Sequence, residues 1–223
     1  MKKHNVRYLH VGCGENILPK PFENLDITER EGVDHVTDAS DLSKFKDETF
    51  DMVYASHVLE HYPRNEVKDV LSEWVRVTKI EGMVRISVPS FENAIKIYQD
   101  TGLIENIIGP IIGGQTYKYE FHYCIFDERS LKYLMEISGL TAVHPWLYQR
   151  TIHSDFWDFS QAETCGTQVS LNLEGRKRNP EALDKDTLWE KDWKKKEDVR
   201  YISQEELIDA FKTQKDEKGQ STR

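Results

Sequence analysis

The feature that most constrains the fold is a short apolar strand that runs directly into two glycines. Residues 8–16 read Tyr-Leu-His-Val-Gly-Cys-Gly-Glu-Asn, so the strand ends at Gly12 and Gly14. Two glycines one residue apart let a backbone turn sharply and approach a ligand where any Cβ would collide. The next short strand closes on Asp26. This layout is typical of α/β proteins that hold a nucleoside-bearing cofactor, although the glycine pair alone also fits a plain turn.

Alternating strand and helix patterns continue beyond this start. Apolar runs predict strands over 6–11, 22–26, 32–38, 50–56, 83–88, 142–148 and 168–174. Apolar residues at helical spacing predict a helix over 67–78, with further helices over 91–98 and between Asp127 and Gly139. Pro145 favours the edge of the sheet for its strand. The pattern predicts a mainly parallel sheet covered on both faces, which binds ligands at the carboxyl ends of its strands.

Composition excludes several classes of protein. The 223 residues carry a formal net charge of −9, which argues against a nucleic-acid partner because such binding depends on clustered Lys and Arg. No stretch approaches the roughly 18 apolar residues that a membrane span needs. The three cysteines Cys13, Cys124 and Cys165 lie far apart and form no CxxC pair, so we expect neither disulfides nor a zinc site. A soluble protein in the reducing cytoplasm is the expectation.

Acidic residues at successive strand ends indicate an adenosyl group. The carboxylate of Asp26 can accept hydrogen bonds from both hydroxyls of a ribose, and Asp38, followed by Ala39, can hold an exocyclic amine of a purine.

A dinucleotide fits this chain less well. Its motif expects a third glycine where the chain has Ile17, and Pro19 and Pro21 shorten the helix whose N-terminus would bind pyrophosphate. The residues therefore favour a cofactor without phosphate, namely S-adenosylmethionine.

The segment after the strand over 50–56 reads Ser56-His57-Val58-Leu59-Glu60-His61. His57 and His61 match the HxxEH motif of inverted zinc proteases, but the chain offers no obvious third ligand and Pro63 leaves only about one helical turn. The alternative is a capped turn in which His61 is bonded locally. We predict no metal site and place His57 at the strand tip, in contact with cofactor or substrate.

Residues 89–126 are predicted to form a lid or substrate-loop insertion. Within it, the stretch 113–123 is too aromatic and polar to be an ordinary linker, and its candidates for substrate binding are Tyr117, Tyr119 and His122. His122 is also a candidate general base, because an imidazole titrates near neutral pH. The alternative is that these side chains only close the top of the domain.

The ordered set of motifs resembles class I S-adenosylmethionine-dependent methyltransferases of type 11, and more narrowly the predicted methyltransferases associated with glycosyltransferase and surface-polysaccharide loci. The motifs are LHVGCGENILP at 9–19, NLDI at 24–27, TDASDL at 37–42, FDMVYASHVLEH at 50–61, EGMVRISVPSFE at 81–92, IGGQTYKYEFHYCIFDERSL at 112–131, WDFSQA at 157–162 and SLNLEGRK at 170–177. The resemblance implies an α/β, Rossmann-like doubly wound sheet with an antiparallel edge strand.

The resemblance also implies roles for residues. It places S-adenosylmethionine against the loop of Gly12, Cys13 and Gly14, and beside Asp26, Ile27, Asp38, Ala39, Ser56 and His57. Many relatives have an acid where this chain has His10. The implied reaction transfers a methyl group to an oxygen or nitrogen of a small-molecule or glycan acceptor, and the general base is then His57 or His122.

The chain is predicted to divide into a methyltransferase domain over 1–177 and a charged tail over 178–223. The tail is expected to be partly helical or disordered, with a capping box at Ser203–Glu206 and with Trp189 and Trp193 on one face. It is either a solvated appendage or a docking element for a partner or second subunit. A catalytically silent binding module that acts through this tail is the alternative function.

Overall fold

The computed structural model describes residues 6–180. The chain divides into two units, Met1–Asn179 and Pro180–Arg223, and the first contains nearly all of the described residues. The predictions for Trp189, Trp193 and the capping box at 203–206 lie outside the described residues.

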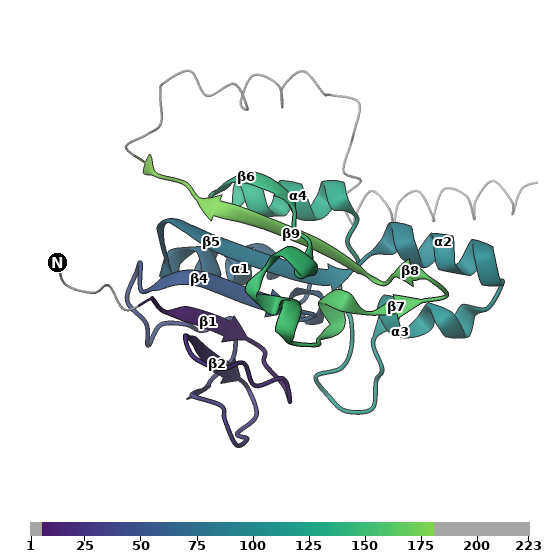
Figure 1. Cartoon of the computed structure of the whole chain (residues 1–223), viewed down its shortest axis with the longest axis horizontal. Helices are drawn as coiled ribbons and strands as arrows, with labels where there is room; N and C mark the ends of the chain where they lie inside the picture. Colours follow the sequence, from purple (N-terminus) through teal and green to yellow (C-terminus); the bar gives the residue numbers. More distant parts are fainter. Residues whose placement is uncertain (1–5, 181–223) are drawn as a thin grey trace, which may run out of the picture. The chain divides into compact units, whose positions relative to one another are not determined.

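A seven-stranded sheet in the order β3-β2-β1-β4-β5-β9-β6 forms the centre of the described unit (Figure 1). Its strands are β1 (Tyr8–Val11), β2 (Phe22–Asp26), β3 (His35–Val36), β4 (Phe50–Ser56), β5 (Thr78–Pro89), β6 (Leu140–Pro145) and β9 (Ser170–Lys177). The first five are parallel, and β9 runs antiparallel to its neighbours β5 and β6. The mainly parallel Rossmann-like sheet is therefore confirmed, with Pro145 on an edge strand that pairs antiparallel.

The register brings three sequence-distant segments to one edge of the sheet. Val11 at the end of β1 lies opposite Leu25 on one side and Ala55 on the other. The residues that follow, Gly12, Asp26 and Ser56, consequently emerge side by side at the carboxyl ends of their strands. This edge is the one at which parallel α/β sheets bind ligands.

Two different coverings protect the faces of the sheet. On one face the helices α1 (Val67–Val77) and α4 (Glu128–Ile137) pack Trp74, Leu71 and Leu131 into the main core. On the other face Trp146 and Phe156 pack on Tyr54 and Phe22. Trp146 and Phe156 come from the segment between β6 and β9. This segment contains the single-turn helices η3 (Tyr148–Arg150), η4 (Ile152–Asp155) and η5 (Phe159–Gln161). In Figure 1 these turns lie in front of the strands and α1 lies behind them.

No helix connects β1 to β2, although the sequence suggested a shortened one between Glu15 and Pro21. Residues 12–21 form turns and irregular backbone. The side chain of Asn24 holds this stretch in place, because its amide donates to the carbonyl of Leu18 at 2.9 Å and its oxygen accepts the N–H of Leu18 at 3.0 Å. These bonds satisfy backbone groups that a helix would otherwise have paired.

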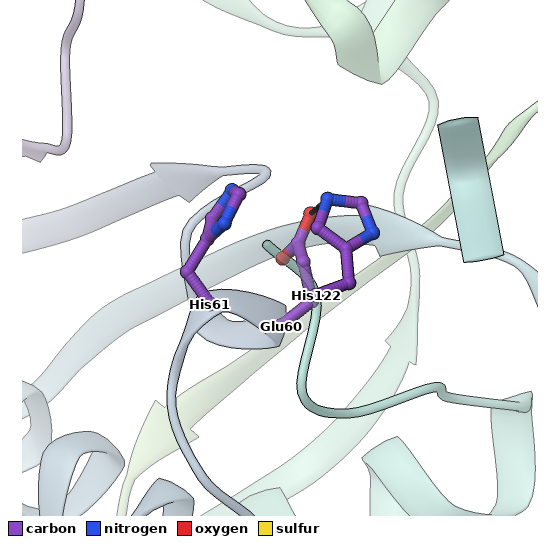
Figure 2. Close-up of side chains that lie close together, drawn as sticks. All are labelled: Glu60, His61 and His122. Atoms are coloured by element: carbon purple, nitrogen blue, oxygen red, sulfur yellow. Dashed lines mark ion pairs between the residues drawn. The ribbon is translucent and has the colours of Figure 1, made fainter. Parts of the chain in front are cut away.

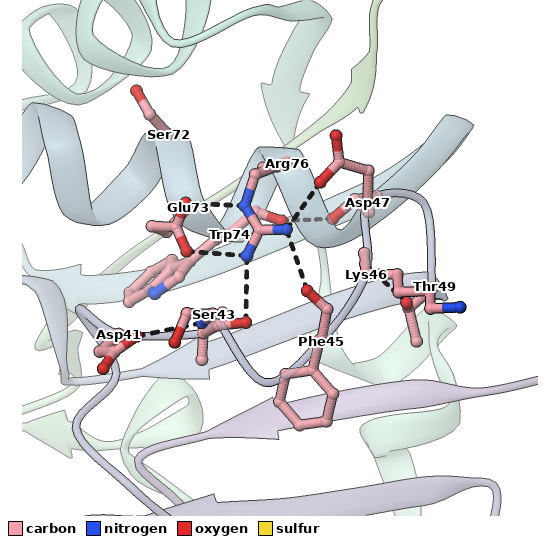
Figure 3. Close-up of polar contacts among 12 residues, drawn as sticks. Asp41, Ser43, Phe45, Lys46, Asp47, Thr49, Ser72, Glu73, Trp74 and Arg76 are labelled. Atoms are coloured by element: carbon pink, nitrogen blue, oxygen red, sulfur yellow. Dashed lines mark hydrogen bonds and ion pairs between the residues drawn. The ribbon is translucent and has the colours of Figure 1, made fainter.

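The connection between β3 and β4 also lacks a helix and is held by Arg76 of α1 (Figure 3). Its guanidinium donates to the carbonyls of Leu42 and Phe45, both at 3.0 Å, and to the carboxylates of Asp47 and Glu73. The fork of donors on one guanidinium suits such a multiple contact. Arg76 thus holds the backbone of the connection that follows Asp38.

Several element boundaries differ from the predictions. α1 ends at Val77 and β5 begins at Thr78, so the helix stops before Gly82. Strand β3 keeps only two residues of the predicted 32–38, whereas β6 and β9 are each shifted by about two residues. The helix α2 (Phe91–Thr101) extends beyond residue 98. Asp127 caps α4 as expected, and the structure adds a reciprocal bond from Ser130 that completes a capping box. A hairpin of β7 (Glu163–Thr164) and β8 (Thr167–Gln168), the short helix α3 (Ile108–Ile112) and the turn η2 (Ile104–Asn106) were not predicted.

Among residues 6–180, no helix has the length and apolar character needed to cross a lipid bilayer.

Candidate cofactor and acceptor site

The glycine loop after β1 is built on left-handed backbone. Gly12 has a φ of 63° and Gly14 a φ of 54°, a region that residues with a Cβ rarely adopt. A Cβ on Gly12 would lie 2.4 Å from Cγ2 of Val58, whereas a Cβ on Gly14 would meet no atom within 4 Å. The two glycines therefore differ: the first packs against the segment after β4, and the second borders open space at the edge of the sheet.

Asp26 fixes the glycine loop to the end of β2. Its carboxylate accepts the backbone N–H of Gly14 and of Thr28, both at 2.8 Å, and it forms an ion pair with Arg30 at 3.4 Å. Cys13 adds a bond from its N–H to the carbonyl of Leu25 at 2.9 Å, and its thiol is buried. Asp26 thus shapes the loop in addition to facing the edge where a ribose is predicted. Ile27 follows with 37 % of its surface exposed, an apolar platform beside this carboxylate.

Asp38 is the second carboxylate at this edge. Its Oδ1 accepts bonds from the N–H and the hydroxyl of Ser40 and from the hydroxyl of Tyr62, at 2.7 to 2.8 Å. Burial raises the pKa of Asp38, but these hydrogen bonds outweigh it and bring the pKa below its usual value. Asp38 is consequently ionised at neutral pH. Ala39 is buried, and its carbonyl accepts the indole N–H of Trp74.

The tip of β4 presents Ser56 and His57. Ser56 lies two residues after Tyr54 and so on the same face of β4. The hydroxyl of Tyr54 donates a short hydrogen bond to the buried Asp158. His57 has a φ of 55°, an unusual value for a residue with a side chain and one that is often found at functional sites.

The imidazole of His57 is fixed in one tautomer. Its Nε2 lies 2.7 Å from Oγ of Ser170, and that hydroxyl in turn donates to the carbonyl of Phe159 at 2.6 Å. Because the serine proton is used there, Nε2 of His57 is the donor and Nδ1 carries the lone pair. Burial, followed by the neighbouring His122 and His61, lowers the pKa of His57 to about 3, so the ring is neutral.

The aromatic stretch 113–123 forms a closed loop. Gly113 has a φ of 82°, and a Cβ there would lie 1.9 Å from the carbonyl oxygen of Glu120. The carboxylate of Glu120 accepts the N–H and hydroxyl of Thr116 at 2.8 and 2.6 Å. At its end, the N–H groups of Tyr123 and Cys124 donate to the carbonyl of Glu60 at 2.8 and 3.2 Å.

Tyr117 and Tyr119 in this loop are exposed. Burial of its hydroxyl raises the pKa of Tyr117, followed by the negative charges of Glu120 and Asp26, while Arg30 lowers it. The charges of Asp26 and Arg30 thus reach the hydroxyl of Tyr117, so the loop lies close to the edge where the ribose is predicted.

The segment after β4 brings Glu60 and His61 next to His122 of the loop (Figure 2). One ligand atom of each residue lies within 4.8 Å of the others. Glu60 is fully buried, with its Oε1 3.3 Å from Nδ1 of His57 and 4.0 Å from Nε2 of His122. Burial raises the pKa of Glu60 to about 8 and lowers the pKa of His61 and His122 below the ordinary value.

The geometry of this segment differs from that of the HxxEH motif of inverted zinc proteases. That motif requires two histidines one turn apart on a helix. Here His57 lies before the single turn η1 (Leu59–His61), with a left-handed backbone, and its ring is held by Ser170. The structure therefore does not place His57 and His61 as a pair of ligands to one metal ion, which agrees with the low weight of this alternative in the sequence.

Sequence reasoning missed three contributors to the site. Glu60 was interpreted as part of a local turn, and Tyr62 and Ser170 were not considered. Glu60 could not have been found from the sequence, because it is the burial of this acid, and not its position after Val58 and Leu59, that calls for a partner. Ser170 could not have been found either, since only the antiparallel insertion of β9 beside β5 brings it to His57.

Comparisons with known proteins agree with this architecture. Residues 9–86 match the family model described as a methyltransferase domain. No curated protein matches the chain in sequence.

Solved structures are similar in fold. A methyltransferase from Thermotoga maritima, described as S-adenosylmethionine-dependent and as a possible histamine N-methyltransferase, has a TM-score of 0.51 and 18% identity, covering 77% of this chain and 82% of that one. One from Archaeoglobus fulgidus, also described as S-adenosylmethionine-dependent, has a TM-score of 0.50 and 18% identity, covering 78% and 87%. A possible exported protein from Bordetella parapertussis has a TM-score of 0.50 and 12% identity, covering 78% and 64%.

The sheet order and the site at its carboxyl edge define a Rossmann-like α/β protein of the class I methyltransferase type. The match of residues 9–86 to a methyltransferase domain includes the glycine loop, Asp26, Asp38 and β4, and together with this fold it supports an S-adenosylmethionine-dependent methyltransferase. The residues present fit this cofactor, because Gly14 borders open space and the site is lined by two carboxylates. The association with glycosyltransferase loci stays a prediction.

Proposed function

We propose that this chain transfers the methyl group of S-adenosylmethionine to an oxygen or nitrogen of a small-molecule or glycan acceptor that binds beneath the loop 113–123. The observation that carries the proposal is the convergence of two sets of groups at one edge of the sheet. The glycine loop, Asp26 and Asp38 form one side, and His57, Glu60, His61 and His122 form the other.

Bound S-adenosylmethionine supplies an electrophilic methyl group on a sulfonium. The protein would hold this cofactor in place. Gly12, Cys13 and Gly14 would form the backbone surface against which it lies, and Asp26 would accept hydrogen bonds from the ribose hydroxyls. The purine would be recognised by Ile27, which offers an apolar surface, and by Asp38, whose Oδ2 has no hydrogen-bond partner among residues 6–180. Ala39 and Ser56 complete the wall of the site.

Positioning of the acceptor would provide most of the rate, because fixed orientation of two reactants can contribute about 7–11 kcal/mol. Tyr117, Tyr119 and His122 would contact the acceptor, and closure of their loop would exclude water. His57 and His122 are the two candidates for a general base. His122 is the better placed of the two, because the proton of its Nδ1 is held by the carbonyl of Pro110 at 3.1 Å, which leaves the lone pair on Nε2.

The test is binding followed by transfer. Calorimetry of the full chain with S-adenosylmethionine and with S-adenosylhomocysteine should show one site, and transfer of a labelled methyl group to a panel of sugars, phenols and amines should identify the acceptor class. Asp38→Asn should weaken binding about tenfold, because it removes a charged acceptor worth ~1–3 kcal/mol.

Asp41→Asn is the matched control, since the exposed Asp41 accepts the N–H of Ser43 at 3.0 Å in the same kind of turn. Absence of any cofactor binding would refute the proposal and favour a silent module.

The proposal further places the protein in the reducing cytoplasm, which the buried, unpaired thiols of Cys13 and Cys124 support.

A further inference from the structure

Within the described part of the chain, the carboxylate of Glu60 is buried without the hydrogen-bond donors that a buried carboxylate needs. Its side chain is fully buried, and neither carboxylate oxygen has a hydrogen-bond partner among residues 6–180. The imidazole nitrogens that face its Oε1 are Nδ1 of His57 at 3.3 Å and Nε2 of His122 at 4.0 Å. A buried carboxylate without donors is costly, and such groups are normally paired or coordinate a metal.

The two imidazoles beside Glu60 are held as metal-binding imidazoles usually are. Nδ1 of His122 lies 3.1 Å from the carbonyl of Pro110, and Nδ1 of His61 lies 3.1 Å from the carbonyl of Phe121. A carbonyl only accepts, so it holds a proton on the ring nitrogen that faces it. In metal sites the ligating histidine almost always donates its other N–H to such a partner, which fixes the tautomer and the ring orientation.

A single proton cannot satisfy this arrangement. A protonated Glu60 could donate to Nδ1 of His57, but Nε2 of His122 would still face the cluster without a donor. A cation accepts electron pairs from the carboxylate and from imidazole nitrogens at the same time. The burial that lowers the pKa of His61 and His122 keeps both rings neutral, which is the form that binds metals.

We propose that Glu60, His61 and His122 bind one divalent transition-metal ion. Two histidines and one glutamate are the protein ligands of many catalytic zinc sites, where a fourth position stays open. Bonds of about 2.0–2.2 Å place tetrahedral ligand atoms roughly 3.4 Å apart, so the present cluster, within 4.8 Å, needs a modest contraction. His61 and His122 are partly exposed, which gives the ion a path of entry.

The site joins two segments that the fold keeps separate in sequence. Glu60 and His61 belong to the turn after β4, and His122 belongs to the loop 113–123. A bound ion would therefore tie the loop to the sheet edge. Resting on the proposed function, the open position would take a hydroxyl of the acceptor, and the ion would lower the pKa of that hydroxyl so that its proton passes to solvent water. The acceptor oxygen would then form the bond to the methyl group as the bond from that methyl to the sulfonium breaks, which leaves the uncharged thioether S-adenosylhomocysteine. His122 then acts as a ligand and not as the general base.

The experiment uses the purified full chain, stripped with a chelator and titrated with Zn²⁺, Co²⁺, Mn²⁺ and Mg²⁺. We expect one equivalent of Zn²⁺ or Co²⁺ by calorimetry, with visible Co²⁺ absorption typical of nitrogen and oxygen ligands. Glu60→Gln and His122→Ala should each weaken binding at least 100-fold. His61→Ala, at a partly exposed position, keeps the test valid if a buried substitution impairs folding, which melting curves will report.

His144→Ala is the matched control. His144 is exposed on the edge strand β6, and its Nε2 also lies 3.3 Å from a carboxylate oxygen, Oε1 of Glu174. Its metal binding should equal that of the wild type. The proposal is overturned if no ion binds at micromolar concentration or if the three ligand variants bind as the wild type does. An infrared band of a protonated carboxylic acid that Glu60→Gln removes and that Zn²⁺ leaves in place would overturn it as well. Binding of S-adenosylmethionine, measured separately, reports on the proposed function.

Discussion

The two sides of the site are built in different ways. On the cofactor side, backbone N–H groups of the glycine loop bond to the end of β2: Gly14 donates to the carboxylate of Asp26 and Cys13 to the carbonyl of Leu25. On the acceptor side, Glu60 and His122 come from segments about sixty residues apart and meet through their side chains. The first side depends on local backbone geometry, and the second on where a long loop is anchored.

This difference teaches which substitutions should affect which step. A change in the glycine loop should disturb folding and cofactor binding together, because the same bonds serve both. A change in the loop 113–123 should leave cofactor binding largely intact and impair transfer. The predictions below test this separation, and a single variant that mixes the two patterns would break it.

Gly12→Ala should have the largest effect. Its Cβ would lie 2.4 Å from Cγ2 of Val58 on left-handed backbone. Overpacking costs about 1–3 kcal/mol and the left-handed conformation about 1–2 kcal/mol more. We expect the free energy of unfolding in urea to fall by ~2–5 kcal/mol and calorimetry to detect no cofactor binding. Gly102→Ala, with a φ of 67° and no atom within 4 Å of its Cβ, is the control and should lose only the conformational part.

Gly113→Ala should impair transfer more than binding. A Cβ there would lie 1.9 Å from the carbonyl oxygen of Glu120, so the loop has to shift. Displacement of a positioning group by about 1 Å can cost 100-fold in rate. We expect such a loss in labelled methyl transfer to the acceptor found by screening, with cofactor affinity changed less than threefold. Gly109→Ala in α3 meets no atom within 4 Å and should behave as the wild type; equal losses in both variants would contradict the proposed lid.

Asp26→Asn should weaken cofactor binding about tenfold. The carboxylate accepts two backbone N–H groups, and an amide can accept only one of them without presenting a donor to the other. An unsatisfied buried donor costs ~1–3 kcal/mol. Asp34→Asn is the control, because Asp34 accepts the N–H of Asn24 at 2.8 Å in a comparable way. Similar loss of affinity in both variants would show that stability alone sets binding.

The smallest predicted effect concerns pH. Burial lowers the pKa of His10 to about 4, although hydrogen bonding to Asn24 opposes the shift. The folded-state pKa lies below the unfolded value near 6.5, so the unfolded chain takes up the proton first and stability falls as the pH drops below 6.5. Between pH 7.5 and 6 this contribution is about 1 kcal/mol. Urea titrations should show a shallower pH dependence for His10→Phe, and an unchanged dependence would refute the assignment.

Most of the fold could be predicted because its determinants are local. The apolar runs before Gly12 and Asp26 and the helical spacing that ends near Val77 are visible in the sequence, and their alternation predicts a mainly parallel sheet. The stretch from residue 12 to residue 21 was harder, since the side chain of Asn24 replaces a helix there.

The candidate site was predictable only in its cofactor half. Asp26 and Asp38 were identified because each follows a strand, and strand ends converge. The contacts of His57 with Ser170 and of Glu60 with His122 depend on the path of β9 and of the loop 113–123. Those paths are set by packing over long sequence separations, which no local pattern records.

The bonds from Tyr123 and Cys124 to the carbonyl of Glu60 have a consequence for redesign. They clamp the end of the loop, and Gly113 fixes its beginning, so residues 114–121 form a cassette between two anchored points. Exchanging this cassette for one of equal length should redirect the choice of acceptor while the donor pocket stays as it is. The chain would then serve as a scaffold in which acceptor specificity is a replaceable part.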